Sequence, residues 1–186
     1  MPNIIGGKYK KTSIEVPHKL VRPTSAFKRE AIFSVLESYS IKQSIEIYKN
    51  KSILDIFAGS GLIGLEAISR GIEKSYFIEN NIEIIKILEK NCQKICKKKE
   101  FEIIFGNAID NLDKKFLIEP SIIFIDPPYS KENINLILLK ILKNKIKTKN
   151  TFIVIEISNK EKIAIPKGLS FIKEKIYGKT KILFLN

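Results

Sequence analysis

The sequence predicts an α/β fold, in which a doubly wound and mostly parallel sheet of seven strands carries helices on both faces. From residue 51 onward, short apolar runs alternate with longer segments of helical periodicity, and such repeated strand–helix units are typical of parallel sheets. The pattern changes near the end of the chain, where only a tight turn separates two apolar runs. This change predicts an antiparallel hairpin at one edge of the sheet.

Each strand and helix can be assigned from the spacing of its apolar residues. The five runs assigned as parallel strands are short and rich in β-branched and aromatic residues, whereas the segments between them have the amphipathic pattern of helices. Strands are expected at residues 51–57, 75–80, 101–107, 121–126 and 151–158, helices at 64–71, 81–99, 108–116 and 132–145, and the hairpin strands at 170–178 and 179–186.

The first fifty residues are organised differently. Residues 4–16 predict a short hairpin arm that turns at a glycine pair, and residues 22–40 predict a helix whose first turn carries Arg22, Pro23 and Thr24. We expect this basic front section to pack across the mouth of the sheet. The chain is expected to form one domain over residues 1–186, with an arm and helix at 1–50 and the core at 51–186.

The composition argues against membrane and metal proteins. No apolar stretch is long enough to span a membrane, and the N-terminus lacks the apolar core of a signal peptide, so we expect a soluble, cytoplasmic protein. The two cysteines, Cys92 and Cys96, lie on a predicted helix far in sequence from the single histidine, His18. These residues cannot assemble a metal site, and they do not suggest a structural disulfide.

The net charge of +13 favours a polyanionic partner, most simply nucleic acid. Most of this charge comes from lysine, because Arg22, Arg29 and Arg70 are the only arginines. Lysine is abundant together with isoleucine and asparagine, as in proteins encoded by AT-rich genes. Part of the charge is therefore a solvated surface with no specific partner.

A glycine-rich loop joins the first strand of the core to its helix. Gly59, Gly61 and Gly64 follow the strand directly and open the helix, in a pattern that lets a ligand approach the backbone. The loop fits a dinucleotide, or S-adenosylmethionine (SAM), which has no phosphate. Asp55 at the tip of the strand would repel a pyrophosphate, but it suits the amino group and sulfonium of SAM. SAM is therefore the favoured ligand.

Polar residues also end the next two strands. Glu79 stands where a carboxylate can accept hydrogen bonds from two ribose hydroxyls, and both candidate ligands contain a ribose. Asn107 and Ala108 can offer an amide and a backbone N–H to an adenine edge. Glu79 and Asn107 also suit plain helix caps. Because the three strand ends share one edge of the sheet, we expect one crevice that holds a nucleoside.

The fourth strand ends in the sequence Asp126-Pro127-Pro128-Tyr129. An Asp-Pro pair by itself commonly begins a turn. It also has a chemical use, because exocyclic amino groups of bases are poor nucleophiles while their lone pair is delocalised into the ring. If the Asp126 carboxylate and the Pro127 carbonyl accept hydrogen bonds from such an amine, its lone pair turns toward the methyl donor. The prolines keep the acceptor rigid, and Tyr129 offers a face for a flipped base.

The motifs DIFAGSG, FIEN, GNA and DPPY, in this order and spacing, resemble those of class I SAM-dependent methyltransferases that act on exocyclic amines. The front section, with IIGG, RPT and KREAIF, is similar to the bacterial RsmD family, which methylates guanine N2 in 16S ribosomal RNA. The resemblance runs from about Ile4 through the final hairpin. It implies a Rossmann-like methyltransferase sheet, SAM as cofactor and ribosomal RNA in a small-subunit particle as substrate. We expect a monomer without metal or membrane contact.

Carried over residue by residue, the resemblance implies specific roles. The loop from Asp55 to Gly61 would surround the methionine part of SAM, and Asp126 to Tyr129 would hold the guanine. The expected cofactor-binding residues are Arg22, Thr24, Asp55, Phe57, Ala58, Gly59, Ser60, Gly61, Glu79, Asn80, Asn107, Ala108 and Asp126; the expected catalytic residues are Asp126, Pro127, Pro128 and Tyr129; and the expected RNA contacts are Lys8, Lys10, Lys11, Arg22 and Arg29.

Two positions depart from the family pattern. Many relatives have Asp-Arg where this chain has Ala26-Phe27, and Arg-Gly where it has Lys10-Lys11. Because lysine lacks the bidentate fork of arginine, we expect these departures to alter contacts with RNA.

Three other functions stay open on the sequence. DPPY is shared by methyltransferases of adenine and cytosine amines, so the target could be an exocyclic amine of another RNA or DNA base. The glycine loop and Glu79 also fit a nicotinamide-dependent oxidoreductase, which would bind NADH instead of SAM but leaves DPPY unexplained. Charge alone fits a non-catalytic ribosome-binding protein, which would bind RNA without affinity for SAM.

Overall fold

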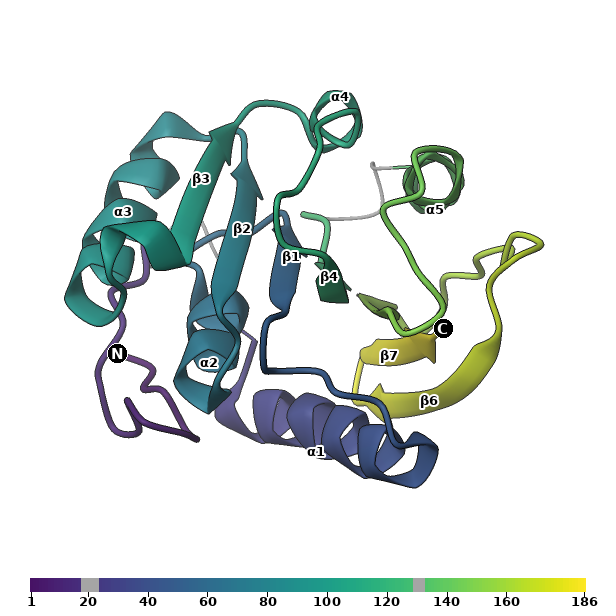
Figure 1. Cartoon of the computed structure of the whole chain (residues 1–186), viewed down its shortest axis with the longest axis horizontal. Coiled ribbons are helices and arrows are strands. Elements are labelled where there is room, and N and C mark those ends of the chain that lie inside the picture. Colours follow the sequence, from purple (N-terminus) through teal and green to yellow (C-terminus); the bar gives the residue numbers. More distant parts are fainter. Residues whose placement is uncertain (18–23, 129–132) are drawn as a thin grey trace.

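The computed structural model describes residues 1–17, 24–128 and 133–186, and its centre is a sheet of seven strands (Figure 1). The helices are α1 (Ala26–Gln43), α2 (Leu62–Arg70), α3 (Ile82–Ile95), the 3-10 helix η1 (Lys98–Glu100), α4 (Ala108–Asn111) and α5 (Ile134–Lys143), and the strands are β1 (Ser52–Ile56), β2 (Lys74–Glu79), β3 (Phe101–Phe105), β4 (Pro120–Ile125), β5 (Phe152–Ser158), β6 (Phe171–Tyr177) and β7 (Thr180–Leu185).

The order of the strands across the sheet is β3-β2-β1-β4-β5-β7-β6. Strands β1 to β5 are parallel to one another, whereas β7 runs antiparallel to both β5 and β6. The predicted doubly wound sheet with a C-terminal antiparallel hairpin is confirmed. The chain reverses its direction of winding between β1 and β4, and ligands of such sheets bind at the carboxyl ends of the strands near this point.

Two hydrophobic clusters fill the space between the sheet and its helices, one on each face. Helices α1, α2 and α3 cover one face, and α4 and α5 cover the other (Figure 1). In β4, Ile122 and Phe124 belong to the first cluster, whereas Ile123 and Ile125 belong to the second. Because the strand is buried on both faces, it is apolar at successive positions, as the sequence indicates.

Helix α1 begins later than predicted. The side chain of Ser25 accepts a hydrogen bond from the backbone N–H of Lys28 at 3.3 Å and so caps the helix. The sequence predicts Thr24 in the first turn of the helix, but Thr24 lies before the helix. Arg22 and Pro23, which were assigned to the same turn, lie outside the described residues.

The N-terminal arm packs against α2 and α3. An antiparallel bridge joins Asn3 to Ser13, and the chain turns between them with Gly7 at φ +70°. A side chain at Gly7 would lie 1.8 Å from the carbonyl oxygen of Ser69 in α2, so only glycine allows this approach. Asn91 of α3 binds the arm backbone through both its amide oxygen and its amide nitrogen. The turn of the arm therefore lies against α2, whereas Thr24 and Lys28 of the same front section lie at the carboxyl ends of the strands.

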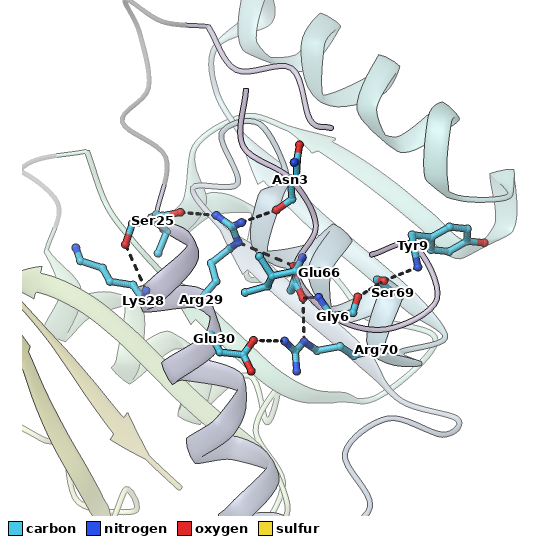
Figure 2. Close-up of polar contacts among 12 residues, drawn as sticks. Asn3, Gly6, Tyr9, Ser25, Lys28, Arg29, Glu30, Glu66, Ser69 and Arg70 are labelled. Atoms are coloured by element: carbon cyan, nitrogen blue, oxygen red, sulfur yellow. Dashed lines mark hydrogen bonds and ion pairs between the residues drawn. The ribbon is translucent and has the colours of Figure 1, made fainter. Parts of the chain in front are cut away.

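Glu66 of α2 is the buried anchor of the arm (Figure 2). Its carboxylate accepts hydrogen bonds from the backbone N–H groups of Ile5 and Gly6 at 2.9 and 2.8 Å. The Nε of Arg70 donates to it at 2.9 Å, and the Nε of Arg29 lies 4.0 Å away. Because a buried charge is tolerated only when it is paired and hydrogen-bonded, this set of partners explains how a glutamate can lie in the core.

Arg29 is buried in the same cluster. Its side chain has no exposed surface, and its two terminal nitrogens donate to the carbonyl oxygens of Thr24 and Asn3, both at 2.6 Å (Figure 2). The prediction that Arg29 contacts RNA is contradicted by this burial. The physical reason is that α1 turns this side chain inward, where the carbonyls of Thr24 and Asn3 accept its hydrogen bonds and the Glu66 carboxylate balances its charge from 4.0 Å.

Candidate active site

A cavity of about 640 Å³ opens at the carboxyl ends of the central strands. Its volume lies within the range of small-molecule and cofactor sites. The predicted residues that line it are Thr24, Asp55, Phe57, Ala58, Gly59, Ser60, Glu79, Asn80, Asp126, Pro127 and Pro128. Arg22 and Tyr129 lie outside the described residues. The cavity thus gathers side chains from four separate parts of the sequence.

The glycine loop is fixed by backbone conformation and by packing. Phe57, Gly59 and Gly61 have φ values of +69°, +55° and +79°. A methyl group at Gly61 would lie 2.4 Å from the Leu88 side chain, and one at Gly64 would lie 2.3 Å from the Phe77 ring. These two glycines are therefore required by contacts beneath the loop, since the loop must pass close to the sheet and to α3.

Asp55 lies beneath the glycine loop. Its Oδ2 accepts a hydrogen bond from the backbone N–H of Gly64 at 3.1 Å, and the residue is only 2% exposed. Burial raises the pKa of Asp55 well above its ordinary value, and the nearby carboxylates of Asp126 and Glu79 add to the rise, against the opposing effect of the Gly64 N–H. A cation bound beside Asp55 would offset this cost.

Glu79 connects the glycine loop to the start of α3. One carboxylate oxygen accepts the N–H of Gly59 at 2.9 Å, and the other accepts those of Asn80 and Asn81 at 2.9 and 3.0 Å. Helix α3 is capped by the side chain of Asn81, so Glu79 is not its side-chain cap. The carboxylate instead fixes the two segments that border the cavity.

Asn107 and Ala108 do not line the cavity. The Asn107 side chain accepts the N–H of Ile109 at 2.8 Å and caps α4, which is the plain structural role that the sequence also allowed. Ala108 is buried in the cluster beneath α4 and α5. Gly61 likewise lies outside the cavity lining, although it shapes the loop.

Asp126 stands at the end of β4 beside a second acidic residue, Glu156 of β5. Ile125 pairs with Ile155 in the parallel ladder of β4 and β5. The residues that follow them, Asp126 and Glu156, therefore lie side by side. Burial, and next the charge of Glu156, raise the pKa of Asp126 to about 8, while Lys28 acts in the opposite direction. The site is therefore acidic on both sides of the point where the strand order reverses.

Three residues that no sequence motif indicated also line the cavity, namely Lys28, Glu156 and Thr180. The Nζ of Lys28 donates to Glu156 at 2.5 Å and to the Thr180 hydroxyl at 2.7 Å, which joins α1 to β5 and β7. One signal was available, because Glu156 is the single charged residue in the apolar run of β5. A charge in such a position has a partner or a function.

The predicted RNA contacts of the arm lie far from the cavity. Lys8, Lys10 and Lys11 are exposed. Lys8 borders a smaller cavity together with Glu73 and Ile118, which precede β2 and β4 and so mark the opposite edge of the sheet. Contact of these lysines with RNA remains a prediction, and any such contact would be remote from the reacting group.

Neither a metal cluster nor a membrane-spanning helix is found in the part of the chain that the structure describes. Within residues 1–17, 24–128 and 133–186, no three histidine, cysteine, aspartate or glutamate side chains are grouped so that they could hold a metal ion. In the same ranges, every helix is too short or too polar to cross a bilayer.

Comparisons with known proteins agree on one family. Residues 2–186 match the family described as Conserved hypothetical protein 95. The chain is 38% identical to the ribosomal RNA small subunit methyltransferase D of Buchnera aphidicola from Acyrthosiphon pisum, covering 93% of this chain and 86% of that protein. It is 30% identical to a protein of Rickettsia prowazekii described as an uncharacterized methylase, covering 100% and 97%.

A solved structure from Escherichia coli, described as a candidate methyltransferase, superposes with a TM-score of 0.82. It covers 98% of this chain and 96% of its own, at 24% sequence identity. This likeness shows that the seven-stranded sheet has the fold of a methyltransferase.

Proposed function

The chain belongs to the family described as Conserved hypothetical protein 95, the RsmD family, and on that premise we propose that it transfers a methyl group from SAM to the N2 amine of a guanine in small-subunit ribosomal RNA. The observation that supports this most strongly is the acidic cavity at the switch point of the sheet. Asp55, Glu79, Asp126 and Glu156 border one cavity with the glycine loop. A cationic nucleoside such as SAM suits these carboxylates, whereas the pyrophosphate of a dinucleotide would be repelled.

The cofactor would lie along the glycine loop. Its amino group and sulfonium would approach Asp55 and Asp126, and its ribose hydroxyls would approach Glu79, whose carboxylate already accepts backbone N–H groups. SAM supplies the activated methyl group. The protein then holds donor and acceptor in line, which is the main contribution of an enzyme to a displacement of this kind.

The target amine would lie between the methyl group and the end of β4. The Asp126 carboxylate and the Pro127 carbonyl would accept its hydrogens, so that the nitrogen lone pair points toward the methyl carbon. As the N–C bond forms and the S–C bond breaks, the amine becomes positively charged, and it then loses one proton. A carboxylate beside it stabilises that charge and can receive the proton.

Ribosomal RNA is proposed as substrate because the related proteins of Buchnera aphidicola are named ribosomal RNA small subunit methyltransferase D. The net charge of +13 agrees with a polyanionic partner. The deciding experiment incubates the protein with labelled SAM and unmodified small-subunit particles, digests the RNA and identifies the labelled nucleoside by mass. N2-methylguanosine is expected; a labelled adenosine or cytidine would assign another base, and absence of label would overturn the proposal.

SAM affinity is expected to depend on Glu79. Replacing Glu79 by glutamine keeps the shape but removes an acceptor that would face the ribose, which leaves hydroxyl groups without their buried partner. We expect SAM binding to weaken on the order of tenfold or more, measured by calorimetry. The matched control is Glu73→Gln, at an exposed glutamate near the opposite edge of the sheet. Equal affinity of the Glu79 variant and the control would remove Glu79 from the cofactor site.

SAM affinity is also expected to rise with pH. Burial raises the pKa values of Asp55 and Asp126 in the free protein, and that of Asp126 reaches about 8, so the Asp126 carboxyl holds a proton near neutral pH. A cation bound beside them favours their ionised forms, and SAM binding should therefore release protons. Lys28 and Glu156 border the same cavity; the charge of Lys28 lowers the pKa of Asp126, and the charge of Glu156 raises it.

Calorimetry near neutral pH, in two buffers with different ionisation enthalpies, counts the protons that are released. S-adenosylhomocysteine is the control, because it lacks the sulfonium charge and should release fewer. Proton uptake on SAM binding, or equal release for both ligands, would show that the raised carboxyls do not contact the sulfonium.

A further inference from the structure

Glu156 is a buried carboxylate that has only one of its oxygens bound. The residue is 7% exposed, and its Oε1 accepts from the Nζ of Lys28 at 2.5 Å. Its Oε2 has no hydrogen-bond partner among the residues that the structure describes. A buried acceptor without a donor costs free energy, and its presence in a ligand cavity indicates a donor on the ligand.

The strand register places this carboxylate next to the proposed catalytic one. Ile125 pairs with Ile155 in the parallel ladder between β4 and β5, so Asp126 and Glu156 follow the paired residues on neighbouring strands. Adjacent strands lie about 4.8 Å apart, and residues in register point to the same face. Both residues line the same cavity. Two carboxylates therefore stand on neighbouring strands and border the same cavity.

Lys28 holds Glu156 in place and balances part of its charge. The Lys28 ammonium lies between the Glu156 carboxylate and the Thr180 hydroxyl, so three elements fix its position. One carboxylate oxygen is thereby committed to the protein. The other is left for a ligand in a direction set by α1, β5 and β7.

The bases differ in what they present beside the exocyclic amine. Guanine has the N1–H donor next to its N2 amine, whereas adenine and cytosine have a ring nitrogen acceptor next to theirs. A flipped base is commonly read along this edge. A carboxylate beside the amine would bond to guanine and would repel the ring nitrogen of the other two bases.

We propose that Glu156 is the specificity-determining residue of the site: its Oε2 accepts the N1–H of guanine, while Asp126 accepts a hydrogen of the adjacent N2 amine. This inference rests on the proposed function, and it adds a basis for choosing guanine. A site built to accept a hydrogen bond discriminates strongly against an analogue that lacks the donor, because its buried acceptor is then left unpaired.

The test compares guanine with 2-aminopurine at the methylated position of the RNA. 2-Aminopurine keeps the reacting amine at the same ring position, but its N1 carries no hydrogen and is an acceptor. It also lacks the O6 of guanine, so the Glu156 variant is needed to assign the preference to N1. The wild-type protein should methylate the guanine RNA with a kcat/KM at least about a hundredfold higher. In Glu156→Gln, Lys28 retains the amide oxygen, so the NH₂ group replaces Oε2 and presents a donor. This variant should lose activity on guanine and reverse the preference or reduce it to a few-fold.

Glu174→Gln, at an exposed residue of β6, is the control and should keep the wild-type ratio. Circular dichroism and thermal unfolding of each variant report that the fold is intact. If the wild-type protein methylates both RNAs equally, or if Glu156→Gln keeps the wild-type ratio, Glu156 does not read the base. If the wild-type protein methylates neither RNA nor small-subunit particles, the proposed function itself fails.

The comparison within the wild-type protein needs no variant. It can still overturn the proposal if Glu156→Gln does not fold, because equal methylation of the two RNAs would show that the N1–H of guanine is not read.

Discussion

Replacing Asp126 by alanine is expected to lower the single-turnover rate of methylation by about a hundredfold or more, the scale of losing one well-placed polar group at a reacting centre. The carboxylate would accept a hydrogen bond from the amine and stabilise the positive charge that develops on it. Both effects are larger in the transition state than in the ground state, so the loss should fall mainly on the chemical step.

The fold of Asp126→Ala should be intact. Asp126 stands beyond the last residue of β4, outside both hydrophobic clusters, and its raised pKa shows that burial costs its charged form free energy. Removing it should not destabilise the protein by leaving a partner unpaired, since Lys28 keeps its bonds to Glu156 and Thr180.

The measurement is a rapid-quench assay with tritiated SAM on small-subunit particles, scored for N2-methylguanosine, together with a SAM titration of the same variant. Asp110→Ala, at an exposed aspartate of α4, serves as the control. A rate within a few-fold of wild type in a folded Asp126 variant would show that the motif beginning at Asp126 only ends the strand and forms a turn.

Replacing Glu66 by alanine is expected to lower the free energy of unfolding by about 3–5 kcal/mol, the range for breaking a buried ion pair by removal of one partner. The variant leaves the N–H groups of Ile5 and Gly6 without their acceptor and leaves Arg29 buried without its nearest carboxylate. Arg70 keeps its surface partners, so the cost should come mainly from Arg29 and from the arm.

Urea denaturation measures this loss. Glu30→Ala is the matched control, because Glu30 pairs with the same Arg70 from an exposed position on α1 (Figure 2). An exposed ion pair contributes little, so the control should change stability by less than about 1 kcal/mol. If Glu66→Ala were no more destabilised than Glu30→Ala, the arm would not depend on the buried carboxylate.

Strand positions and the carboxyl edge could be predicted from sequence because local patterns determine them. The apolar runs gave all seven strands within a few residues, and the motifs at the ends of β1, β2 and β4 converge on one cavity. The spacing of apolar residues along the sequence identifies the strands, and their parallel arrangement places their carboxyl ends at one edge of the sheet.

Partners far apart in sequence could not be predicted. Arg29 has the sequence surroundings of a surface residue, and only Glu66 and the carbonyls of Thr24 and Asn3, brought together by folding, show that it is buried. Lys28 and Glu156 likewise meet across α1 and β5. Asn107 shows the reverse case, since its position at a strand end suggested a ligand, but the local capping bond to Ile109 occupies its side chain.

The reversal of the strand order between β1 and β4 divides the cavity lining into two sets of residues, one from each side of this point. Strands β1, β2 and β3 and their loops carry the glycine loop and Glu79, whereas β4, β5 and β7 carry Asp126, Glu156 and Thr180. On the proposed function, substitutions in the second set would change which base is methylated while most contacts with SAM are kept. Asp126 is the exception, because it would face both ligands. The two parts meet at the β1–β4 ladder, in which Ile53 pairs with Ile122 and Leu54 with Ile123.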